Sequence, residues 1–208
     1  MLNWNPEGSH VNKELSVQLN PAAAAVPAIW LRNAGIVLSG SALAAVCAHI
    51  ALPLYFTPVP LTLAPFAVLV LGLLLTPRLA AATLLAYLAE GALGLPVFAP
   101  TPVFAGGLAH LLGPTGGYLL AYPFAAMLIS FLWRSAAADG FGAALISAAA
   151  GNLAILACGA LWLAVLTHVS AQSALTLAVL PFLPGDALKI AAAASLAAGF
   201  HRLRRHKP

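Results

Sequence analysis

Charge is scarce in this sequence. Only 7% of its 208 residues are Asp, Glu, Lys or Arg, whereas 62% are hydrophobic and the mean hydropathy is +0.97. A soluble domain carries about 25% charged residues, and a chain with so few could not cover its surface in water. Runs of about 20 apolar residues are instead typical of helices that span a membrane. The composition therefore predicts an integral membrane protein of one domain.

Cysteines and metal-ligand patterns are scarce as well. The two cysteines, Cys47 and Cys158, each lie inside an apolar segment, which excludes a disulfide framework and favours small buried side chains. The six histidines show no pair spaced four residues apart, so we expect no metal site. A haem held between His49 and His110 stays open as an alternative, although hydrogen bonding is the commoner role of a lone histidine near a membrane interface.

Catalytic motifs are missing too. The glycine pairs Gly106-Gly107 and Gly116-Gly117 are followed by no Gly-Lys-Ser/Thr sequence, so the chain lacks a phosphate-binding loop and is not expected to hydrolyse ATP. Ser39 lacks the preceding glycine of a nucleophile elbow, and no acid–histidine partner for it is evident. We therefore expect no enzymatic activity and no cofactor.

The net charge of +4 comes mostly from a short tail at the C-terminus. No basic face with groove-reading elements accompanies it, so nucleic-acid binding is excluded and an anionic membrane surface is the expected neighbour. Residues 1–28 are polar and then alanine-rich, and they lack the basic start of a cleavable signal. We predict an N-terminal tail at 1–28, a membrane domain at 29–200 and a basic tail at 201–208.

Proline and glycine divide the membrane domain into apolar segments. Irregular backbone between such segments is tolerated at membrane depth only inside the protein or along a cavity. The predicted fold class is an all-α integral membrane protein with six transmembrane helices and irregular apolar connectors on its outer side. The predicted spans are Ile29–Leu52, Leu61–Leu75, Leu79–Leu93, Gly116–Trp133, Phe141–Thr167 and Asp186–Phe200.

Basic residues are distributed unevenly around these spans. Six spans put both termini on one side, and that side carries eight of the nine Lys and Arg residues. Because cytoplasmic loops are enriched in Lys and Arg, both termini are predicted to be cytoplasmic. The eight residues are Lys13, Arg32, Arg78, Arg134, Arg202, Arg204, Arg205 and Lys207.

The ninth basic residue, Lys189, lies inside the last span. A Lys at the centre of a bilayer costs about 2.5–3.5 kcal/mol to insert, which makes it a candidate functional residue. Asp186 precedes it by three residues and shares its helical face. The structural alternative is a mutual ion pair, with Asp186 also capping the helix after Pro184-Gly185.

Further polar and aromatic residues are predicted at the outward ends of the spans, beside Asp186 and Lys189. An outer cavity lined by such groups above an aliphatic floor is the expected form of a small-molecule site. Asn152, in the middle of the fifth span, either packs or binds. The candidate ligand-binding residues are Asp186, Lys189, Tyr118, Thr115, Glu90, Trp162 and Asn152.

Small residues recur along the first span. Gly40, Ala44 and Ala48 are spaced four apart, with Ser41 and Ala45 beside them. This spacing lets membrane helices approach closely. The face therefore serves either internal packing or the docking of a partner subunit.

Three motifs carry a resemblance to a known family. They are Gly94-Leu95-Pro96-Val97-Phe98-Ala99, Gly113-Pro114-Thr115-Gly116-Gly117-Tyr118, and Pro184-Gly185-Asp186 followed by Lys189. Over roughly residues 30–200 the chain resembles BioY, the biotin-binding membrane component of energy-coupling-factor (ECF) transporters. It departs from the family at Ala64-Pro65, where a glutamine is usual, and at residues 100–105, where the family tends to glycine-rich sequence.

The resemblance implies six helices and high-affinity capture of biotin near the outer face of a bacterial plasma membrane. It also implies assembly with a transmembrane coupling protein, contacted by the small-residue face of the first helix, and with two ATPase subunits. Asp186 would accept hydrogen bonds from the ureido N–H groups of biotin, and Lys189 would donate to a ligand oxygen. Tyr118 or Trp162 would cover the bicycle of the ligand.

Two other functions stay open at this point. A stand-alone ion- or proton-coupled carrier would use Glu90, Asp186 and Lys189. A membrane anchor without a ligand would leave the outward polar residues unexplained.

Overall fold

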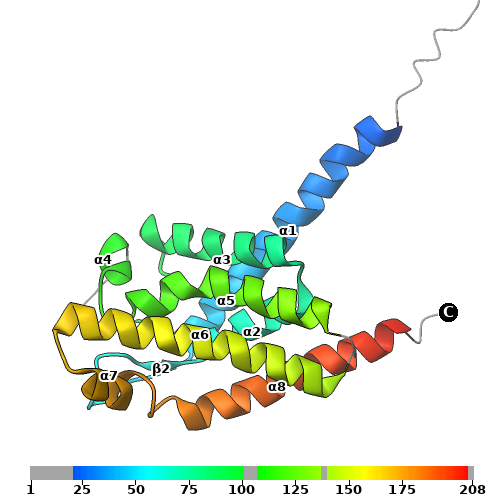
Figure 1. The fold of residues 1–208 in the computed structure, drawn as a ribbon. Helices are drawn as coiled ribbons and strands as arrows, with labels where there is room; N and C mark the ends of the chain where they lie inside the picture. Colours follow the sequence, from blue (N-terminus) through cyan, green and yellow to red (C-terminus); the bar gives the residue numbers. More distant parts are fainter. Residues whose placement is uncertain (1–20, 101–106, 137–139, 206–208) are drawn as a thin grey trace, which may run out of the picture.

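The computed structural model describes residues 21–100, 107–136 and 140–205, and these ranges are mostly helical (Figure 1). Most of the predicted N-terminal tail, connector residues 101–105 and Lys207 lie outside the described residues. Two short strands, β1 (Ala51–Leu52) and β2 (Leu61–Thr62), pair antiparallel. The helices are α1 (Pro21–His49), α2 (Ala64–Leu74), α3 (Pro77–Ala92), α4 (Leu108–Leu111), α5 (Gly116–Ser135), α6 (Phe141–Thr167), α7 (Ala171–Ala178) and α8 (Leu183–Arg205).

The long helices pass back and forth between two ends of the molecule (Figure 1). α3 and α6 begin at the end where α5 and α8 finish, on the right of the figure. We call this the cationic end, because Arg78, Arg134 and Arg202 lie there. The opposite end holds α4, α7 and the β1–β2 pair, and we call it the connector end.

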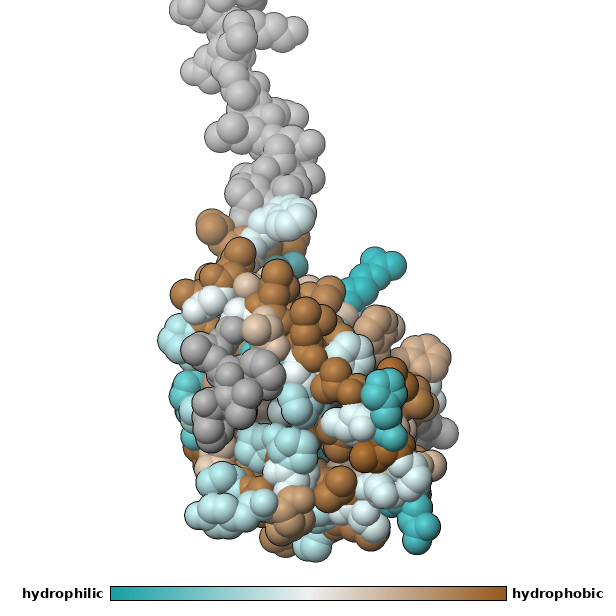
Figure 2. All heavy atoms as spheres, turned by 90° about the vertical axis from the view of Figure 1, so that its left-hand side faces the viewer, coloured by the Kyte–Doolittle hydropathy of each residue, from teal (hydrophilic) through white to brown (hydrophobic). Residues whose placement is uncertain are grey.

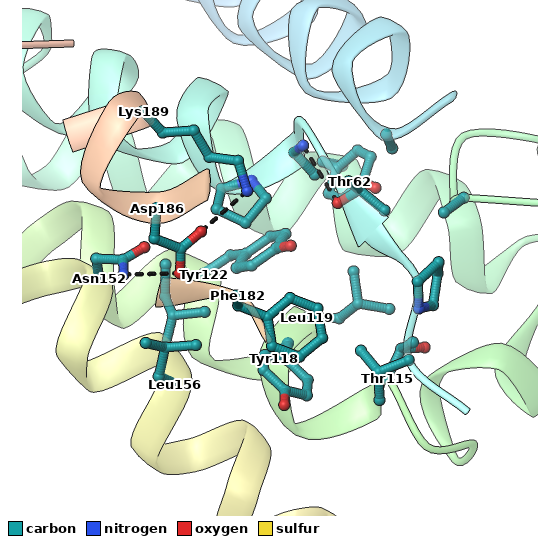
Figure 3. Close-up of a pocket in the computed structure, with 18 of the residues that line it drawn as sticks. Thr62, Thr115, Tyr118, Leu119, Tyr122, Asn152, Leu156, Phe182, Asp186 and Lys189 are labelled. Atoms are coloured by element: carbon teal, nitrogen blue, oxygen red, sulfur yellow. Dashed lines mark hydrogen bonds and ion pairs between the residues drawn. The ribbon is translucent and has the colours of Figure 1, made fainter. Parts of the chain in front are cut away.

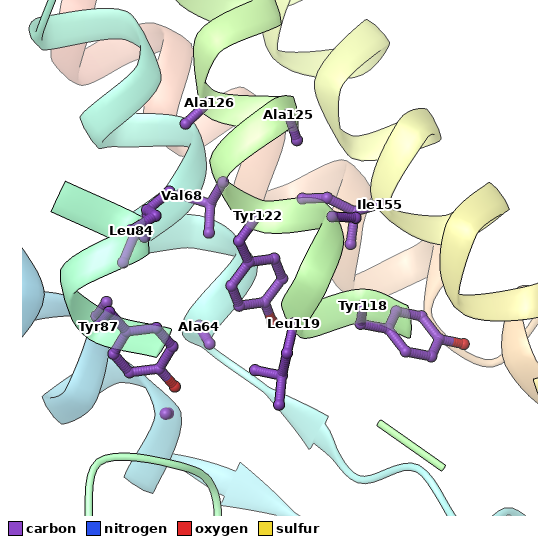
Figure 4. Packing of buried hydrophobic residues seen from close by; sticks show 14 of the residues in the cluster. Ala64, Val68, Leu84, Tyr87, Tyr118, Leu119, Tyr122, Ala125, Ala126 and Ile155 are labelled. Carbon is purple, nitrogen blue, oxygen red and sulfur yellow. The ribbon is translucent and has the colours of Figure 1, made fainter. Parts of the chain in front are cut away.

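The short helix α2 lies at the centre of the bundle. It contacts α1, α5, α6 and α8, and its Val68 and Leu69 are fully buried. Ala64 and Val68 of α2 lie close to Leu84 of α3 and Tyr122 of α5 (Figure 4). A helix that is apolar on every side can be enclosed by other helices without burying polar groups, which is compatible with its central position.

Three helices are long and apolar enough to cross a membrane: α5, α6 and the Ile29–His49 part of α1. α7 and α8 are bent by 55° at the break between them and make a fourth crossing if they count as one broken span. α2 has 11 residues and a length of about 16 Å, shorter than a hydrocarbon core of about 30 Å. The fold is thus a helical membrane bundle with three or four candidate crossings, and the six-span topology and the orientation of the termini stay predictions.

Large apolar side chains are prominent on the described surface. On α6, Ile146, Leu153 and Leu161 are 66–71% exposed. Figure 2, a view onto the connector end, shows hydrophobic residues interspersed with paler and hydrophilic ones. Lipid accommodates such a surface, whereas a monomer in water rarely exposes one.

The two terminal helices run past the residues of the predicted membrane domain, whose limits stay a prediction. α1 begins at Pro21 and α8 continues to Arg205. α1 ends at His49 rather than at Leu52, because Ala51 and Leu52 leave the helix to pair with β2. The proline-rich connector between the first two spans, predicted to be non-helical, forms the loop between these strands.

The connector before the last helix is more regular than predicted. Residues 171–178 form α7, whose first turn is capped by the Ser170 hydroxyl, which accepts from the Ser173 backbone N–H at 3.2 Å. α8 begins at Leu183 and not at Asp186. The N-cap role that the structural alternative assigned to Asp186 does not hold: Asp186 lies inside the first turn, and its backbone N–H donates to Phe182 O at 2.8 Å. Pro184 fits this first turn because no helical N–H bond is needed there.

The small-residue face of α1 packs inside the chain. Ser41, Ala44 and Ala48 are at most 1% exposed, and Ala45 is half-buried. A Cβ placed on Gly40 would lie 2.6 Å from Thr83 Cγ2 of α3. This close approach agrees with the internal-packing alternative. The docking of a partner subunit through this face stays a prediction.

Candidate ligand-binding site

The Asp186 carboxylate is bound on both of its oxygens by buried side chains. Lys189 Nζ donates to Oδ1 at 2.9 Å, and Asn152 Nδ2 of α6 donates to Oδ2 at 3.0 Å (Figure 3). Asp186 is 3% exposed, Lys189 8% and Asn152 4%. Because Asp186 and Lys189 are three residues apart on α8, the helix itself brings the opposite charges together.

One acceptor of this cluster has no partner within the described residues. Asn152 Oδ1 is buried and makes no hydrogen bond to a described residue. Leaving a buried acceptor unpaired costs about 1–3 kcal/mol. A ligand that donates a hydrogen bond at this point would recover that free energy.

The Asp186 cluster lines a cavity of about 50 Å³. Its walls come from β2 and the loop before it, and from the helices α1 to α6 and α8. Five of the seven candidate residues of the sequence line it: Asp186, Lys189, Asn152, Tyr118 and Thr115. Further lining residues include Thr62, Pro65, Tyr87, His110, Leu119, Tyr122, Ile155 and Phe182.

Tyr118 offers its ring to the cavity, because its hydroxyl is already occupied. The hydroxyl donates to Ala178 O at the end of α7 at 2.5 Å, and the ring lies 6.1 Å from that of Phe182. The ring also rests on the backbone of α6, since a Cβ on Gly159 would lie 2.3 Å from Tyr118 Cε1. The two aromatic rings therefore provide an apolar wall near the buried charges (Figure 3).

Tyr87 is a cavity residue that the sequence reasoning missed. It is fully buried, and its hydroxyl has no hydrogen-bond partner among the described residues. Its ring packs edge-on against Phe98 with centroids 5.3 Å apart. In the sequence Tyr87 lies in an apolar run and resembles any aromatic residue of a core. Its hydroxyl is the one feature that could have pointed to the cavity, because a buried Tyr O–H usually has a hydrogen-bond partner.

Glu90 and Trp162, which the sequence placed in the site, do not line the cavity. The Glu90 carboxylate accepts a hydrogen bond from Ser41 Oγ and so links α3 to α1. Trp162 Nε1 donates to Gly113 O at 2.9 Å and fixes the chain where it enters α5. Both positions have a role in the packing of helices and connectors, and their contact with a ligand stays a prediction.

The described residues contain no group of three or more His, Cys, Asp or Glu side chains that could hold a metal ion. His49 Nδ1 lies 2.8 Å from the carbonyl of Ala45 in its own helix. His110 is buried beside Phe98, with ring centroids 5.1 Å apart. The arrangement suits an organic ligand with hydrogen-bond donors and an apolar body.

A buried pair of charges, an unpaired amide oxygen and aromatic walls define a membrane protein with a small-molecule site inside its helix bundle. Residues 16–206 match the model of the BioY family, so the chain belongs to this family.

Relatives of known name and structure agree with this assignment. The chain is 43% identical over 140 residues to a probable biotin transporter BioY of Pyrococcus horikoshii, covering 67% of this chain and 79% of that one. It is 35% identical over 163 residues to the biotin transporter BioY of Thermotoga maritima, covering 78% and 92%. The crystal structure of the S-component for biotin from an ECF-type ABC transporter superposes with a TM-score of 0.75 at 27% identity, covering 85% and 93%. These relatives are named as transporters and not as enzymes.

Proposed function

We propose that this chain is the substrate-binding membrane component of an ECF-type uptake transporter and that its ligand is biotin. The observation that carries the proposal is the Asp186–Lys189–Asn152 cluster beside a cavity, in a chain of the BioY family. Buried charges inside a membrane bundle mark ligand or ion pathways.

The chemistry of biotin complements the cluster. Its ureido ring carries two N–H donors, which Asp186 and the unpaired Asn152 Oδ1 can accept. Its carbonyl oxygen is an acceptor for Lys189 or for the unpaired Tyr87 hydroxyl. The bicycle would then lie against Tyr118 and Phe182. A nanomolar ligand needs about −12 kcal/mol, which charge-assisted hydrogen bonds and apolar burial together can supply.

Binding requires the cavity to widen. Its volume of about 50 Å³ is below the range of about 300–1,000 Å³ that is usual for small-molecule sites. Val59 and Pro60 of the lining belong to the loop between β1 and β2. A loop moves at a lower cost than packed helices, so we expect this loop to move aside when biotin binds.

The proposal extends to topology and partners. Six crossings with cytoplasmic termini, in a bacterial plasma membrane, would put the cationic end inside the cell and the connector end outside. Arg78, Arg134 and Arg202 at one end support this orientation. Because the sequence contains no phosphate-binding loop, the energy for uptake would come from two ATPase subunits through a transmembrane coupling protein.

Calorimetric titration of the purified protein with biotin tests the proposal. We expect one molecule to bind per chain, and Lys189→Ala to weaken binding at least tenfold. The absence of heat at micromolar biotin, with the protein folded by circular dichroism, would contradict it. Gradient-driven uptake into liposomes that lack ATPase subunits would instead favour the stand-alone carrier.

A further inference from the structure

The last turn of α7 ends in two backbone carbonyls that accept hydrogen bonds from side chains of other segments. The final carbonyls of a helix have no partner within the helix, so their partners come from elsewhere. Thr57 Oγ1 donates to Leu177 O at 2.9 Å, and the Tyr118 hydroxyl donates to the next carbonyl, Ala178 O, at 2.5 Å. Thr57 belongs to the loop between β1 and β2, and Tyr118 belongs to α5. The end of α7 therefore joins this loop to the aromatic wall of the cavity.

The loop between β1 and β2, residues 53–60, has few polar contacts with the rest of the bundle. Within the described part of the chain, the bond from Thr57 to Leu177 O is the one hydrogen bond between this loop and a helix. Three of the loop residues are prolines, which have no N–H to donate. Thr57 Oγ1 also accepts from the Val59 N–H at 3.4 Å, so one hydroxyl bonds both to α7 and to its own loop.

Thr57 is buried, although it is a polar residue of a loop. It is 8% exposed, and Val59, two residues later, is 4% exposed. Val59 and Pro60 line the cavity around Asp186, whereas Thr57 is not among the described residues of the lining. Apolar packing has no direction, whereas a hydrogen bond fixes the relative position of its two partners. The Thr57 hydroxyl therefore determines where the cavity-lining part of the loop lies against α7.

We propose that Thr57 is a positioning residue that holds the loop against the cavity, and that its bond to Leu177 O sets the rate of ligand exchange. This inference rests on the proposed function, because it takes biotin as the ligand. A cavity of about 50 Å³ is too small for that molecule, so a wall must move before biotin enters or leaves. Loop opening breaks the bond from Thr57 and leaves Leu177 O without its partner. The bond from Tyr118 to Ala178 O meanwhile keeps the end of α7 in place.

Such a bond acts on both directions of ligand exchange. When the loop is closed in the free and in the biotin-bound protein alike, a weaker bond makes opening more frequent in both. The association and dissociation rate constants then rise by the same factor, and the affinity stays the same. A residue that only shapes the bound state changes the dissociation rate constant alone. The net contribution of one neutral hydrogen bond corresponds to a change of about two- to tenfold in the opening equilibrium.

Stopped-flow measurement of biotin binding to the purified full-length protein tests the proposal. Thr57→Val keeps the shape of the side chain and removes the hydroxyl. We expect both rate constants to rise about two- to tenfold, with the affinity unchanged. Thr57→Ser keeps the hydroxyl and should retain the rates of the wild type. The matched control is Thr176→Val on α7, which removes a hydroxyl bonded at 2.9 Å to Ser173 O of the same helix and should change neither rate.

Thiol labelling of the ligand-free protein separates this proposal from the proposed function. Val59→Cys places a buried thiol on the loop, in a chain whose Cys47 and Cys158 are replaced by alanine. A water-soluble maleimide should label this thiol faster when Thr57→Val is added, but not when Thr57→Ser or Thr176→Val is added. A wild-type protein that binds no biotin would contradict the proposed function, while the labelling rates would still decide whether Thr57 holds the loop.

Three results would overturn the inference. Equal acceleration by Thr57→Ser and Thr57→Val would assign the effect to the packing of the methyl group. A rise in the dissociation rate constant alone would make Thr57 a residue that shapes only the bound state. Unchanged labelling on addition of Thr57→Val would show that the bond does not hold the loop. If Thr57→Val does not fold, Thr57→Cys, whose thiol is a weak donor, decides the question through the two rate constants.

Discussion

The interior and the cationic end of the bundle hold basic side chains in opposite ways. Inside the bundle, Lys189 is 8% exposed and lies 2.9 Å from the carboxylate of Asp186, with Asn152 on the second oxygen. At the cationic end Arg134 is exposed, and its Nε donates to Ser130 Oγ at 3.3 Å. A buried charge must be paired where it lies, whereas a charge at the interface is solvated by water and headgroups. The surroundings of each cation therefore decide whether it must be paired within the protein.

The side chains around each cation differ as well. Among the described residues, the charges inside the bundle have unpaired polar atoms and aromatic rings near them, whereas the exposed Arg134 at the cationic end is bonded to Ser130. Four substitutions, from the largest expected effect to the smallest, test which side chains inside the bundle serve the ligand and which serve the fold.

The largest effect is expected for Asp186→Asn. Breaking a buried ion pair from one side costs about 3–5 kcal/mol of stability, because Lys189 is left charged and unpaired. Biotin affinity should fall at least tenfold. Chemical unfolding in detergent and calorimetric titration measure the two quantities.

A double variant, Asp186→Asn with Lys189→Met, separates these effects. Stability should return toward that of the wild type because no buried charge remains, while biotin binding stays lost. Full recovery of binding would show that the pair serves the fold alone.

Gly159→Ala should have the next largest effect. The new methyl group would lie 2.3 Å from the Tyr118 ring, so the ring must move away from α6. Such overpacking costs about 1–3 kcal/mol of stability, and biotin affinity should fall with it. The control is Gly142→Ala in the same helix, where a Cβ meets no atom within 4 Å and the helix should gain about 0.5–1 kcal/mol.

Tyr87→Phe should move stability and affinity in opposite directions. The variant removes a buried hydroxyl that has no partner among the described residues, so the ligand-free protein should be at least as stable as the wild type. A lost hydrogen bond to biotin should weaken binding up to about tenfold. A stability loss with unchanged affinity would mean that the hydroxyl serves the fold and not the ligand.

The smallest effect is expected for Ser41→Ala. The variant removes the hydrogen bond to Glu90 and should cost about 1 kcal/mol of stability, measured by thermal unfolding. Biotin affinity should not change, because neither residue lines the cavity. A tenfold loss of affinity would instead place Glu90 in the ligand pathway.

Much of the site was predictable because helical spacing is local. The three-residue separation puts Asp186 and Lys189 on one face in any helix, and their presence in an apolar segment is a signal by itself. Pairing of the strands at Ala51 and Leu52, and the start of α8 at Leu183, were not predictable in this way. The strand pairing depends on the contact of Ala51 with Thr62 across the proline-rich loop, and α8 begins before Asp186 because Pro184 fits its first turn.

The sequence by itself determined the class of this protein, its membership in a family and the buried ion pair, because composition, motifs and helical spacing need no tertiary contacts. The tertiary structure alone decided which polar residues share the cavity. Glu90 and Tyr87 lie less than one turn apart on α3, yet Tyr87 lines the cavity while Glu90 bonds to α1. The rotation of each helix about its axis is set by packing against its neighbours, and the sequence of one helix does not determine that packing.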